Sequence, residues 1–439
     1  MTAILAVALQ SPLIFNPGYF GADELQWWAR ADVLWSQLPW VSWRDLQVFQ
    51  YRPLTFNLWL VLAHALAANA YAMHAVFVMI GTINALLIAA TLHSMGVARP
   101  TATVAALVFV CSPFVAYTHG WTGTLADLLV LLFGLLAFAA LRMLHGETSA
   151  IRLACVAFGV ALLQALALAA KESAIVLPLL MLCAAISHET PRRVAAIAGV
   201  AGAIVSLYLA LRLQTLLGSN ASGYAWQLSD VPGRLAEYLL YPWLPSLFEI
   251  GPSLEKSAWR IAIAVTCLAG LVFALARSGW RHAAAFVVLY AGMLAPVLVL
   301  ERSCNQYAYL ASAAAVGVVA YAWRSATQVS KALILATASI VCLHGAGVAM
   351  RMREIGVIEV RFHDTLADLL AAQSSTFAIA PARPSDTWLL RRFTDGVPNY
   401  RGIVFTGRVF TANAPDGSIH ATMASDGSLS LAPTGEPAR

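Results

Sequence analysis

The ionisable residues that could do chemistry in this chain of 439 residues cluster near the ends of long apolar runs, whose midpoints are almost free of charge. Carboxylates in such a set can act as a general base, and Arg and Lys can hold a phosphate group. Because ionisable groups near a membrane are costly and usually paired or functional, we expect a polar site at one membrane face. Its candidate members are Asp23, Glu24, Arg52, His119, Asp127, Lys171, Glu172, Arg212, Glu301 and Arg302.

Several of these residues also allow a purely structural interpretation. Asp23 precedes the helix-prone segment 24–35 and could be its N-cap. Lys171 could pair with Glu172 or with Asp127 instead of binding a ligand. The other structural alternatives are an ion pair of Arg302 with Glu301, an Arg212 side chain that reaches from its span to the interface, a hydrogen-bonded His119 and an interfacial aromatic Tyr307.

The composition is that of a membrane protein. Only 11% of the residues are charged, against about 25% in an ordinary globular domain, while 60% are hydrophobic and the mean hydropathy is +0.73. The net charge of +5 is attributed to basic loops, so no nucleic-acid partner is expected. The six cysteines form no CxxC pattern, and the carboxylates lie in separate loops, so neither a disulfide framework nor a metal cofactor is expected.

Apolar runs near the length that spans a bilayer, about 20 residues, predict an all-α polytopic fold of eleven transmembrane helices. Short loops on one side of these spans collect most of the Lys and Arg, which marks that side as cytoplasmic. The N-terminus is then cytoplasmic and the candidate site faces the periplasm of a bacterial inner membrane. The predicted spans are 1–14, 70–93, 101–118, 124–143, 152–170, 173–188, 194–217, 259–277, 281–300, 306–323 and 331–350.

The predicted domain organisation has two parts. Residues 1–350 form the transmembrane domain, with a tryptophan-rich outer loop at 15–69 that should contain surface helices and a second outer loop at 218–258. Residues 351–439 should form a small periplasmic α+β domain. They begin with a helix at 360–372 and continue with strand-like runs between Asp-Gly turn signals.

Six short motifs follow one another between about residues 15 and 325. They are Gly21-Ala22-Asp23-Glu24; Tyr51-Arg52-Pro53-Leu54-Thr55; His74 with Asn84; His119 with Ala126-Asp127-Leu128-Leu129; Ala170-Lys171-Glu172-Ser173 followed by Leu177-Pro178; and Glu301-Arg302 with Tyr307 and Tyr309-Leu310. In this order the chain resembles the GT-C superfamily of polyprenyl-phosphate-sugar-dependent glycosyltransferases, in particular the protein O-mannosyltransferase type and its tetratricopeptide-tailed relatives. It departs from that pattern in lacking a Tyr directly after Glu-Arg and in lacking tetratricopeptide repeats.

The resemblance implies a GT-C-like fold and an inverting transfer from a polyprenyl-phosphate-linked sugar to an acceptor hydroxyl at the periplasmic face. It favours Asp23 as the base, with Glu24 as a helper. Protein, glycan and lipid acceptors all stay open, and membrane lipids are the expected surroundings. The candidate ligands of the donor phosphate are Arg52, Lys171, Arg212 and Arg302, and the supporting residues are His119, Asp127, Glu172, Glu301 and Tyr307.

Two other function classes compete with this interpretation. An O-antigen polymerase or ligase would use arginines in a large late outer loop, whereas the large acidic loop here is the first one. A lipid or sugar transporter would be expected to keep carboxylates or broken helices near the membrane midplane, where this chain has almost no ionisable residue.

Overall fold

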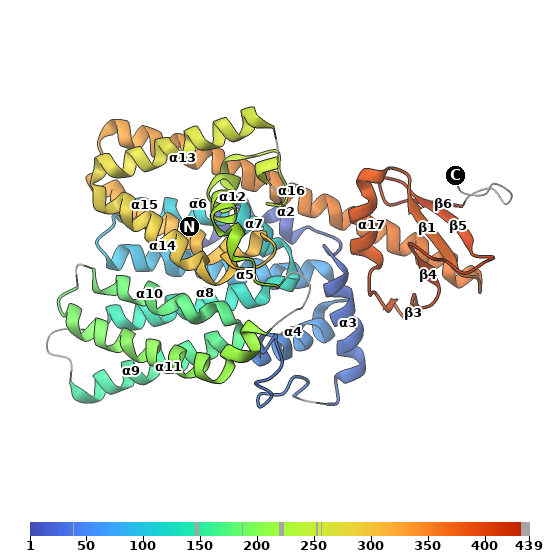
Figure 1. The fold of residues 1–439 in the computed structure, drawn as a ribbon, viewed down its shortest axis with the longest axis horizontal. Coiled ribbons are helices and arrows are strands. Elements are labelled where there is room, and N and C mark those ends of the chain that lie inside the picture. The colour runs from blue at the N-terminus through green and yellow to red at the C-terminus, as the bar shows by residue number, and fades with distance from the viewer. Residues whose placement is uncertain are drawn as a thin grey trace.

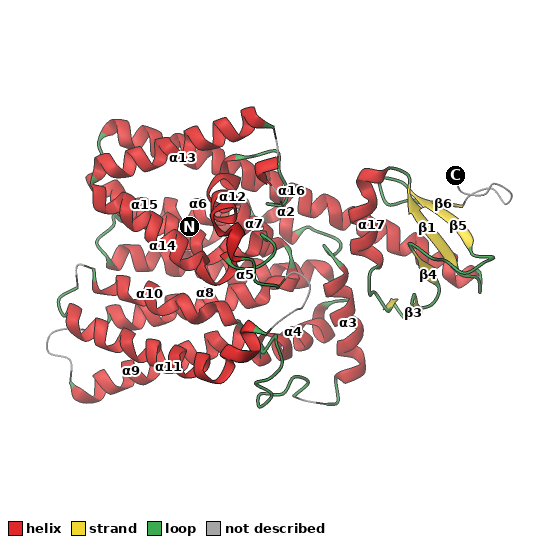
Figure 2. Ribbon diagram, viewed as in Figure 1, coloured by secondary structure: helices red, strands yellow, loops and turns green. Residues whose placement is uncertain are grey.

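The computed structural model describes residues 1–37, 39–144, 149–186, 188–218, 224–251, 253–255 and 257–431. The chain is mostly helical, and its strands are confined to the C-terminal part (Figure 2). Within the described ranges seven helices are apolar and long enough to cross a membrane, so the chain is a polytopic membrane protein. They are α5 (Ala70–Ser94), η1 with α8 (Thr122–Arg142), α9 (Ala150–Ala170), α11 (Pro191–Leu217), α13 (Ala258–Ser278), α14 (Trp280–Leu298) and α16 (Gln328–Ala372).

The predicted count of eleven spans is not confirmed. The other four predicted segments are helical but are short or interrupted. The segment 101–118 forms two helices that meet at an angle of 61° before Pro113, and counting them as one broken span gives eight. A straight helix of 14 residues is only about 21 Å long, shorter than the hydrocarbon core. The four predicted segments contain the helices α1 (Thr2–Leu9), α2 (Ser11–Ile14), α6 (Arg99–Val110), α7 (Pro113–Gly120), η2 (Glu172–Val176), α10 (Leu177–Leu182), η3 (Cys183–Ala185), η7 (Asn305–Ala308), α15 (Tyr309–Ala322) and η8 (Trp323–Ser325).

The arginine-bearing loops share one end of the helix bundle. Nη1 of Arg142 donates to the carbonyl of Ala184 at 3.1 Å, and Nη1 of Arg324 donates to the carbonyl of Met95 at 3.1 Å. The C-terminal domain lies at the opposite end, which we call the distal end (Figure 1). The predicted segregation of basic loops from the candidate site is therefore present, whereas the assignment of these two ends to cytoplasm and periplasm stays a prediction.

The two long connections of the distal end contain short helices, as predicted for the first of them. The helix α3 lies beside the C-terminal domain (Figure 1). Their described elements are α3 (Ala22–Leu34) and α4 (Pro53–Leu66) in the first connection, and η4 (Leu228–Asp230), α12 (Val231–Leu240), η5 (Tyr241–Trp243) and η6 (Ser253–Glu255) in the second.

The helix α16 joins the two parts of the chain as one element of 45 residues. The sequence predicts a span ending at 350 and a separate helix from 360, so the predicted domain boundary falls inside this helix. No proline interrupts it, and Arg351 pairs with Glu354 one turn further on, at 2.6 Å. At about 1.5 Å per residue α16 is about 68 Å long, enough to cross a membrane and continue into the C-terminal domain.

The C-terminal domain has an α+β fold in which a four-stranded sheet has the order β4-β1-β5-β6. β1 (Phe377–Pro381) runs parallel to both β4 (Val409–Phe410) and β5 (Ile419–Met423), and β6 (Leu429–Leu431) is antiparallel to β5. A hairpin of β2 (Asn399–Tyr400) and β3 (Ile403–Val404) and the helix α17 (Thr387–Thr394) complete it, with η9 (Pro384–Asp386) before α17.

The β5–β6 turn docks this sheet onto α16. Gly427 has a φ of 88°, and a Cβ there would lie 2.3 Å from the carbonyl oxygen of Ile358. Only glycine combines that backbone conformation with so close an approach. The sequence signal Asp426-Gly427 therefore marks a turn, as predicted, and also a domain contact.

Candidate functional site

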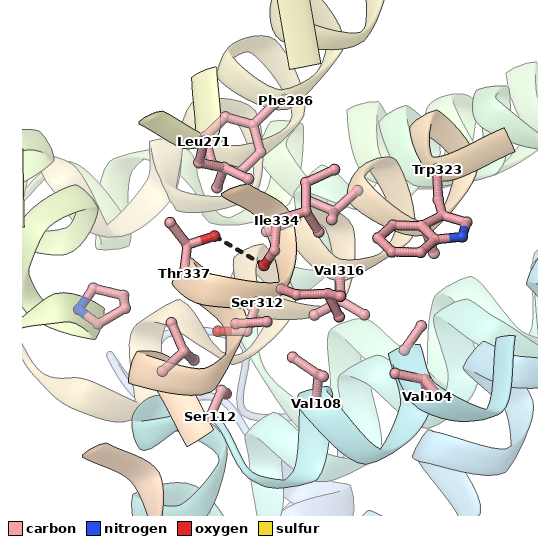
Figure 3. Close-up of a pocket in the computed structure, with 18 of the residues that line it drawn as sticks. Val104, Val108, Ser112, Leu271, Phe286, Ser312, Val316, Trp323, Ile334 and Thr337 are labelled. Atoms are coloured by element: carbon pink, nitrogen blue, oxygen red, sulfur yellow. Dashed lines mark hydrogen bonds between the residues drawn. The ribbon is translucent and has the colours of Figure 1, made fainter. Parts of the chain in front are cut away.

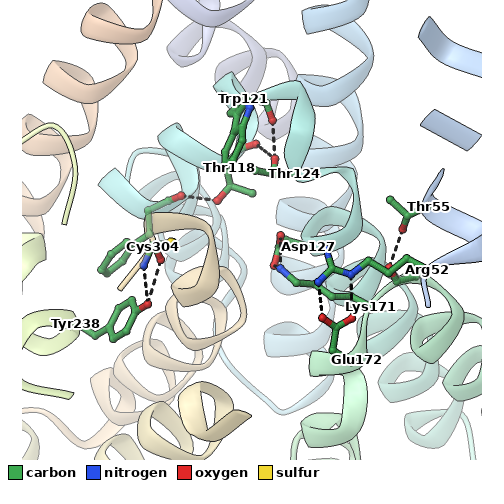
Figure 4. Close-up of polar contacts among 12 residues, drawn as sticks. Arg52, Thr55, Thr118, Trp121, Thr124, Asp127, Lys171, Glu172, Tyr238 and Cys304 are labelled. Carbon is green, nitrogen blue, oxygen red and sulfur yellow. Dashed lines mark hydrogen bonds and ion pairs between the residues drawn. The ribbon is translucent and has the colours of Figure 1, made fainter. Parts of the chain in front are cut away.

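Two ion pairs lie side by side at the distal end of the membrane domain (Figure 4). Nζ of Lys171, at the C-terminus of α9, donates to both carboxylate oxygens of Asp127 at 2.7 and 2.8 Å. The guanidinium of Arg52, at the N-terminus of α4, holds both oxygens of Glu172, with Nε at 2.9 Å. The pairing of Lys171 with Asp127 is one of the structural alternatives that the sequence left open.

Hydrogen bonds between elements fix the positions of these pairs. Oγ1 of Thr55, in the first turn of α4, donates to the carbonyl of Ala170 at 2.8 Å, which holds Arg52 beside Lys171 (Figure 4). Nε1 of Trp59, one turn further along α4, donates to the carbonyl of Thr122 at 2.6 Å. The helix α4 is thereby tied both to the end of α9 and to the start of α8.

A cavity of about 470 Å³ opens beside the two pairs. Its polar end contains Arg52, Lys171 and Glu172 together with the aromatic side chains of Tyr224 and Tyr307. Nζ of Lys171 lies 4.9 Å from the ring centre of Tyr307. The rest of the wall is apolar and comes mainly from two spans, with Val205, Leu209, Leu213 and Leu216 from α11 and Ala295, Pro296 and Val297 from α14.

Both cations retain hydrogen-bond donors after their ion pairs are made. An ammonium group has three N–H bonds and a guanidinium has five. Asp127 accepts two from Lys171, and Glu172 accepts two from Arg52. One donor on Lys171 and three on Arg52 are thus not used by these carboxylates. The four charges sum to zero, yet the polar end of the cavity can still donate hydrogen bonds to an anion.

Arg212, predicted to bind phosphate, holds the chain that leads into the site. Its guanidinium donates to the carbonyls of Leu46, Val48 and Phe49, at 2.6 Å for Val48 and 2.7 Å for Phe49. Phe49 lines the cavity. Buried Arg212 therefore fixes one wall of the cavity and does not reach from its span into the interface, while its contact with a donor phosphate stays a prediction.

Glu24 is buried and accepts four hydrogen bonds. One oxygen takes the amides of Phe20 and Gly21, at 2.7 and 2.8 Å, and the other takes the amide and hydroxyl of Thr122, at 2.9 and 2.7 Å. Burial raises the pKa of Glu24 to about 7, although all four hydrogen bonds favour the charged form. Glu24 thus closes the N-terminus of α3 and connects it to η1, so it positions Asp23.

Asp23 is exposed in the first turn of α3, where Gly21 occupies the N-cap position. Its predicted alternative role as an N-cap is not what the structure shows. Loss of hydration beside the protein raises the pKa of Asp23 above its usual value, and the charge of Arg392 opposes that shift. Asp23 is therefore an accessible carboxylate beside a cation, in a conformation fixed by its neighbour Glu24.

The connection that leads into α3 packs closely on α16. The amide of Tyr19 donates to Oε2 of Glu359 at 3.1 Å. A Cβ at Gly18 would lie 2.3 Å from that same carboxylate oxygen and 2.3 Å from the carbonyl of Gly356. This segment therefore needs glycine at position 18 to reach its place against α16.

Three further residues belong to this region that the sequence did not point to. Nη2 of Arg392, in α17, donates to Oε1 of Glu249 at 2.6 Å, and the hydroxyl of Tyr117 donates to the same oxygen at 2.8 Å. Arg392 and Tyr117 thereby hold Glu249 between α17 and α7.

The remaining predicted residues lie at different depths. Arg302 is exposed and makes no hydrogen bond or ion pair with the residues that the structure describes. Glu301 is half-buried in the turn after α14. His119 lies in the core, where Nδ1 is 2.5 Å from Oε1 of Gln10 and Nε2 is 2.8 Å from the hydroxyl of Tyr309. Both ring nitrogens of His119 are thus occupied within the fold.

A second cavity, of about 360 Å³, lies among α6, α13, α14, α15 and α16 (Figure 3). Its walls are apolar except for a few hydroxyl groups, among them those of Ser112, Ser312 and Thr337. The hydroxyl of Thr337 is already bonded to the carbonyl of Ile334 at 3.0 Å. This cavity suits a hydrocarbon chain and offers no charge to an anionic head group.

The described part of the chain contains no cluster of three or more His, Cys, Asp or Glu side chains that could hold a metal ion. No family model, no curated protein and no solved structure matches this sequence.

Proposed function

We propose that this protein is a membrane glycosyltransferase that moves a sugar from a polyprenyl-phosphate-linked donor to an acceptor hydroxyl, at the periplasmic face of a bacterial inner membrane. The observation that carries the proposal is the cavity between α11 and α14. It combines an apolar wall from two membrane-spanning helices with a polar end that contains Arg52 and Lys171. A lipid with one phosphate at the end of a long hydrocarbon chain has this same distribution of polarity.

In the proposed complex the polyprenyl chain lies against the apolar residues of α11 and α14. The donor phosphodiester accepts hydrogen bonds from the N–H groups of Lys171 and Arg52 that Asp127 and Glu172 do not use. Tyr224 and Tyr307 border the same position, and Arg302 is an exposed cation that could reach the phosphate from the surface. Charge-assisted hydrogen bonds of this kind stabilise the phosphate further as it becomes a leaving group.

Asp23 is the proposed general base. It accepts the proton of the acceptor hydroxyl while that oxygen forms a bond to the anomeric carbon, and the bond from that carbon to the phosphate oxygen breaks. The products are the glycosylated acceptor, the polyprenyl phosphate and a protonated Asp23, which returns its proton to water. A raised pKa favours this role, because a base is most effective when its pKa lies near the working pH.

Lipid binding by the purified full-length protein tests the proposal. Undecaprenyl phosphate is compared with undecaprenol in lipid nanodiscs by native mass spectrometry, so that the phosphate is the only difference between the probes. We expect the phosphate-bearing lipid to bind at least about tenfold more tightly, the value of one charge-assisted hydrogen bond. Equal binding of the two lipids would contradict the proposal.

A paired substitution removes the cation without leaving a buried carboxylate unpaired. Lys171→Met combined with Asp127→Asn should keep the fold, because both members of the pair become neutral together, and should abolish the preference for undecaprenyl phosphate. The control removes an exposed pair of the C-terminal domain, Arg361→Ala with Asp426→Ala, whose members lie 2.5 Å apart. A double variant at 171 and 127 that keeps the preference would remove Lys171 from the proposed site.

A further inference from the structure

We infer that Arg392 of the C-terminal domain is a positioning residue of the candidate site, which fixes Glu249 and covers the start of α3 beside Asp23. The catalytic meaning of this inference rests on the proposed function, but the contact itself does not. It makes the C-terminal domain part of the site rather than an appendage of the membrane domain.

The position of Arg392 follows from the helix that carries it. In α17 the neighbouring Leu390 and Phe393 are buried in the C-terminal domain, so Arg392 points away from that core toward the membrane domain. Its guanidinium carbon lies 4.1 Å from the ring centre of Phe20, which is three residues before Asp23. A Cβ on Gly21 would lie 3.6 Å from Nη1 of Arg392. The guanidinium therefore covers the start of α3.

Glu249 holds the other side of the guanidinium. The oxygen that accepts from Nη2 of Arg392 at 2.6 Å also accepts from the hydroxyl of Tyr117 at 2.8 Å. The ring of Phe20 packs edge-on against Tyr117, with centroids 5.3 Å apart. Arg392, Glu249, Tyr117 and Phe20 come from α17, the second long connection, α7 and the first long connection. One cation thus joins the C-terminal domain to three parts of the membrane domain.

Among the described residues, Arg392 is the charged group that acts on Asp23. Glu24, on the same helix, is turned inward and has all four of its hydrogen bonds satisfied. Glu249 accepts hydrogen bonds from Arg392 and from Tyr117. Among the described residues, Arg392 is the cation that lowers the pKa of Asp23 against the opposing effect of lost hydration. Without Arg392 the pKa of Asp23 should rise, so less of the carboxylate would be charged at neutral pH.

Carbodiimide labelling measures the protonation of Asp23 without any substrate, because carbodiimides react with the protonated carboxyl group. The extent of labelling with a glycine ester is followed against pH by peptide mass spectrometry in full-length protein. Because Asp23 and Arg392 are partly exposed, we expect Arg392→Ala to move the pH midpoint of Asp23 labelling upward by about half a pH unit. Arg392→Lys should stay close to the wild type. Arg391→Ala, which removes the exposed neighbouring arginine, is the matched control and should not move the midpoint.

The direction of the shift separates an electrostatic role from a purely structural one. If Arg392 only fastened the C-terminal domain, Arg392→Ala would expose Asp23 to water and move the midpoint downward. An unchanged or lowered midpoint in Arg392→Ala overturns the inference, as does an upward shift of equal size in Arg391→Ala.

Failure of this inference can be told apart from failure of the proposed function. If undecaprenyl phosphate binds no better than undecaprenol while Arg392→Ala still raises the midpoint, the assignment of Arg392 stands and the donor is wrong. If the lipid preference is present and the midpoint does not move, the assignment of Arg392 fails alone. In an active preparation, the acidic limb of kcat/KM against pH should move upward in Arg392→Ala by the same amount as the labelling midpoint.

Discussion

Replacing Glu24 by Gln should loosen the start of α3 although the two side chains have nearly the same shape. One carboxylate oxygen of Glu24 accepts hydrogen bonds from the amides of Phe20 and Gly21. The other oxygen accepts from the amide and the hydroxyl of Thr122. A glutamine turned with its NH₂ group toward Thr122 can donate to the Thr122 hydroxyl, but the Thr122 amide then loses its acceptor and the other three hydrogen bonds lose the carboxylate charge. With about 1.5 kcal/mol for the lost bond and about 0.5 kcal/mol for each of the other three, the loss is about 3 kcal/mol.

Hydrogen exchange detects this loss where it occurs. About 3 kcal/mol corresponds to roughly a hundredfold faster exchange of the Phe20, Gly21 and Thr122 amides if they exchange through local opening. The measurement is made at pH 8, because burial raises the pKa of Glu24 to about 7 and the carboxylate must be charged. Asp23→Asn is the matched control, since it makes the same chemical change at the exposed neighbour. If both variants exchange like the wild type, the four hydrogen bonds do not hold this connection in place.

The other predictions concern the base, the cavity wall and the topology. Asp23→Asn should leave the hydrogen-exchange pattern unchanged. It should slow the release of undecaprenyl phosphate from a panel of lipid-linked sugars at least about a hundredfold, the scale of losing a general base. Release at the normal rate would exclude Asp23 as the base. Arg212→Gln should make the chain before Phe49 more sensitive to limited proteolysis, because three carbonyls lose a shared cation, and undiminished resistance would contradict this. A cysteine at Ser229 should react with an impermeant maleimide in spheroplasts and one at Gln328 only after lysis; the opposite pattern would invert the orientation.

The long helices could be predicted from the sequence because length and hydropathy alone define them, as in α5 and α11. The shorter predicted spans form broken or short helices, which hydropathy alone does not distinguish from full spans. Hydropathy does not register the bend before Pro113, and α15 has only 14 residues. The continuity of α16 was missed because its apolar part ends near residue 350 while its helical hydrogen bonding continues.

The candidate site was only partly predictable. Charges at the ends of apolar runs indicated Asp127, Lys171 and Glu172 as candidate residues. Their pairing could not be predicted, because Asp127 and Lys171 are 44 residues apart and meet only in the folded chain. The capping role of Glu24 was hidden because its N-cap is Gly21, which has no side-chain oxygen and so does not complete the usual Ser/Thr-x-x-Glu signature.

Arg392 and Glu249 could not be found from local sequence at all. Arg392 follows Arg391 in the last turn of a short helix, a position typical of a solvated basic pair. Glu249 follows an aromatic run in a segment without helical or strand periodicity. Their contact joins residues 143 positions apart, and no pattern within either segment indicates the other.

The most direct test of the proposed donor site is a cryo-electron microscopy structure of the full-length protein with undecaprenyl phosphate. The account predicts phosphate density within hydrogen-bond distance of Nζ of Lys171 and of the guanidinium of Arg52, with the hydrocarbon chain between α11 and α14. Lipid density confined to the second cavity of Figure 3, with no phosphate beside Lys171, would contradict it.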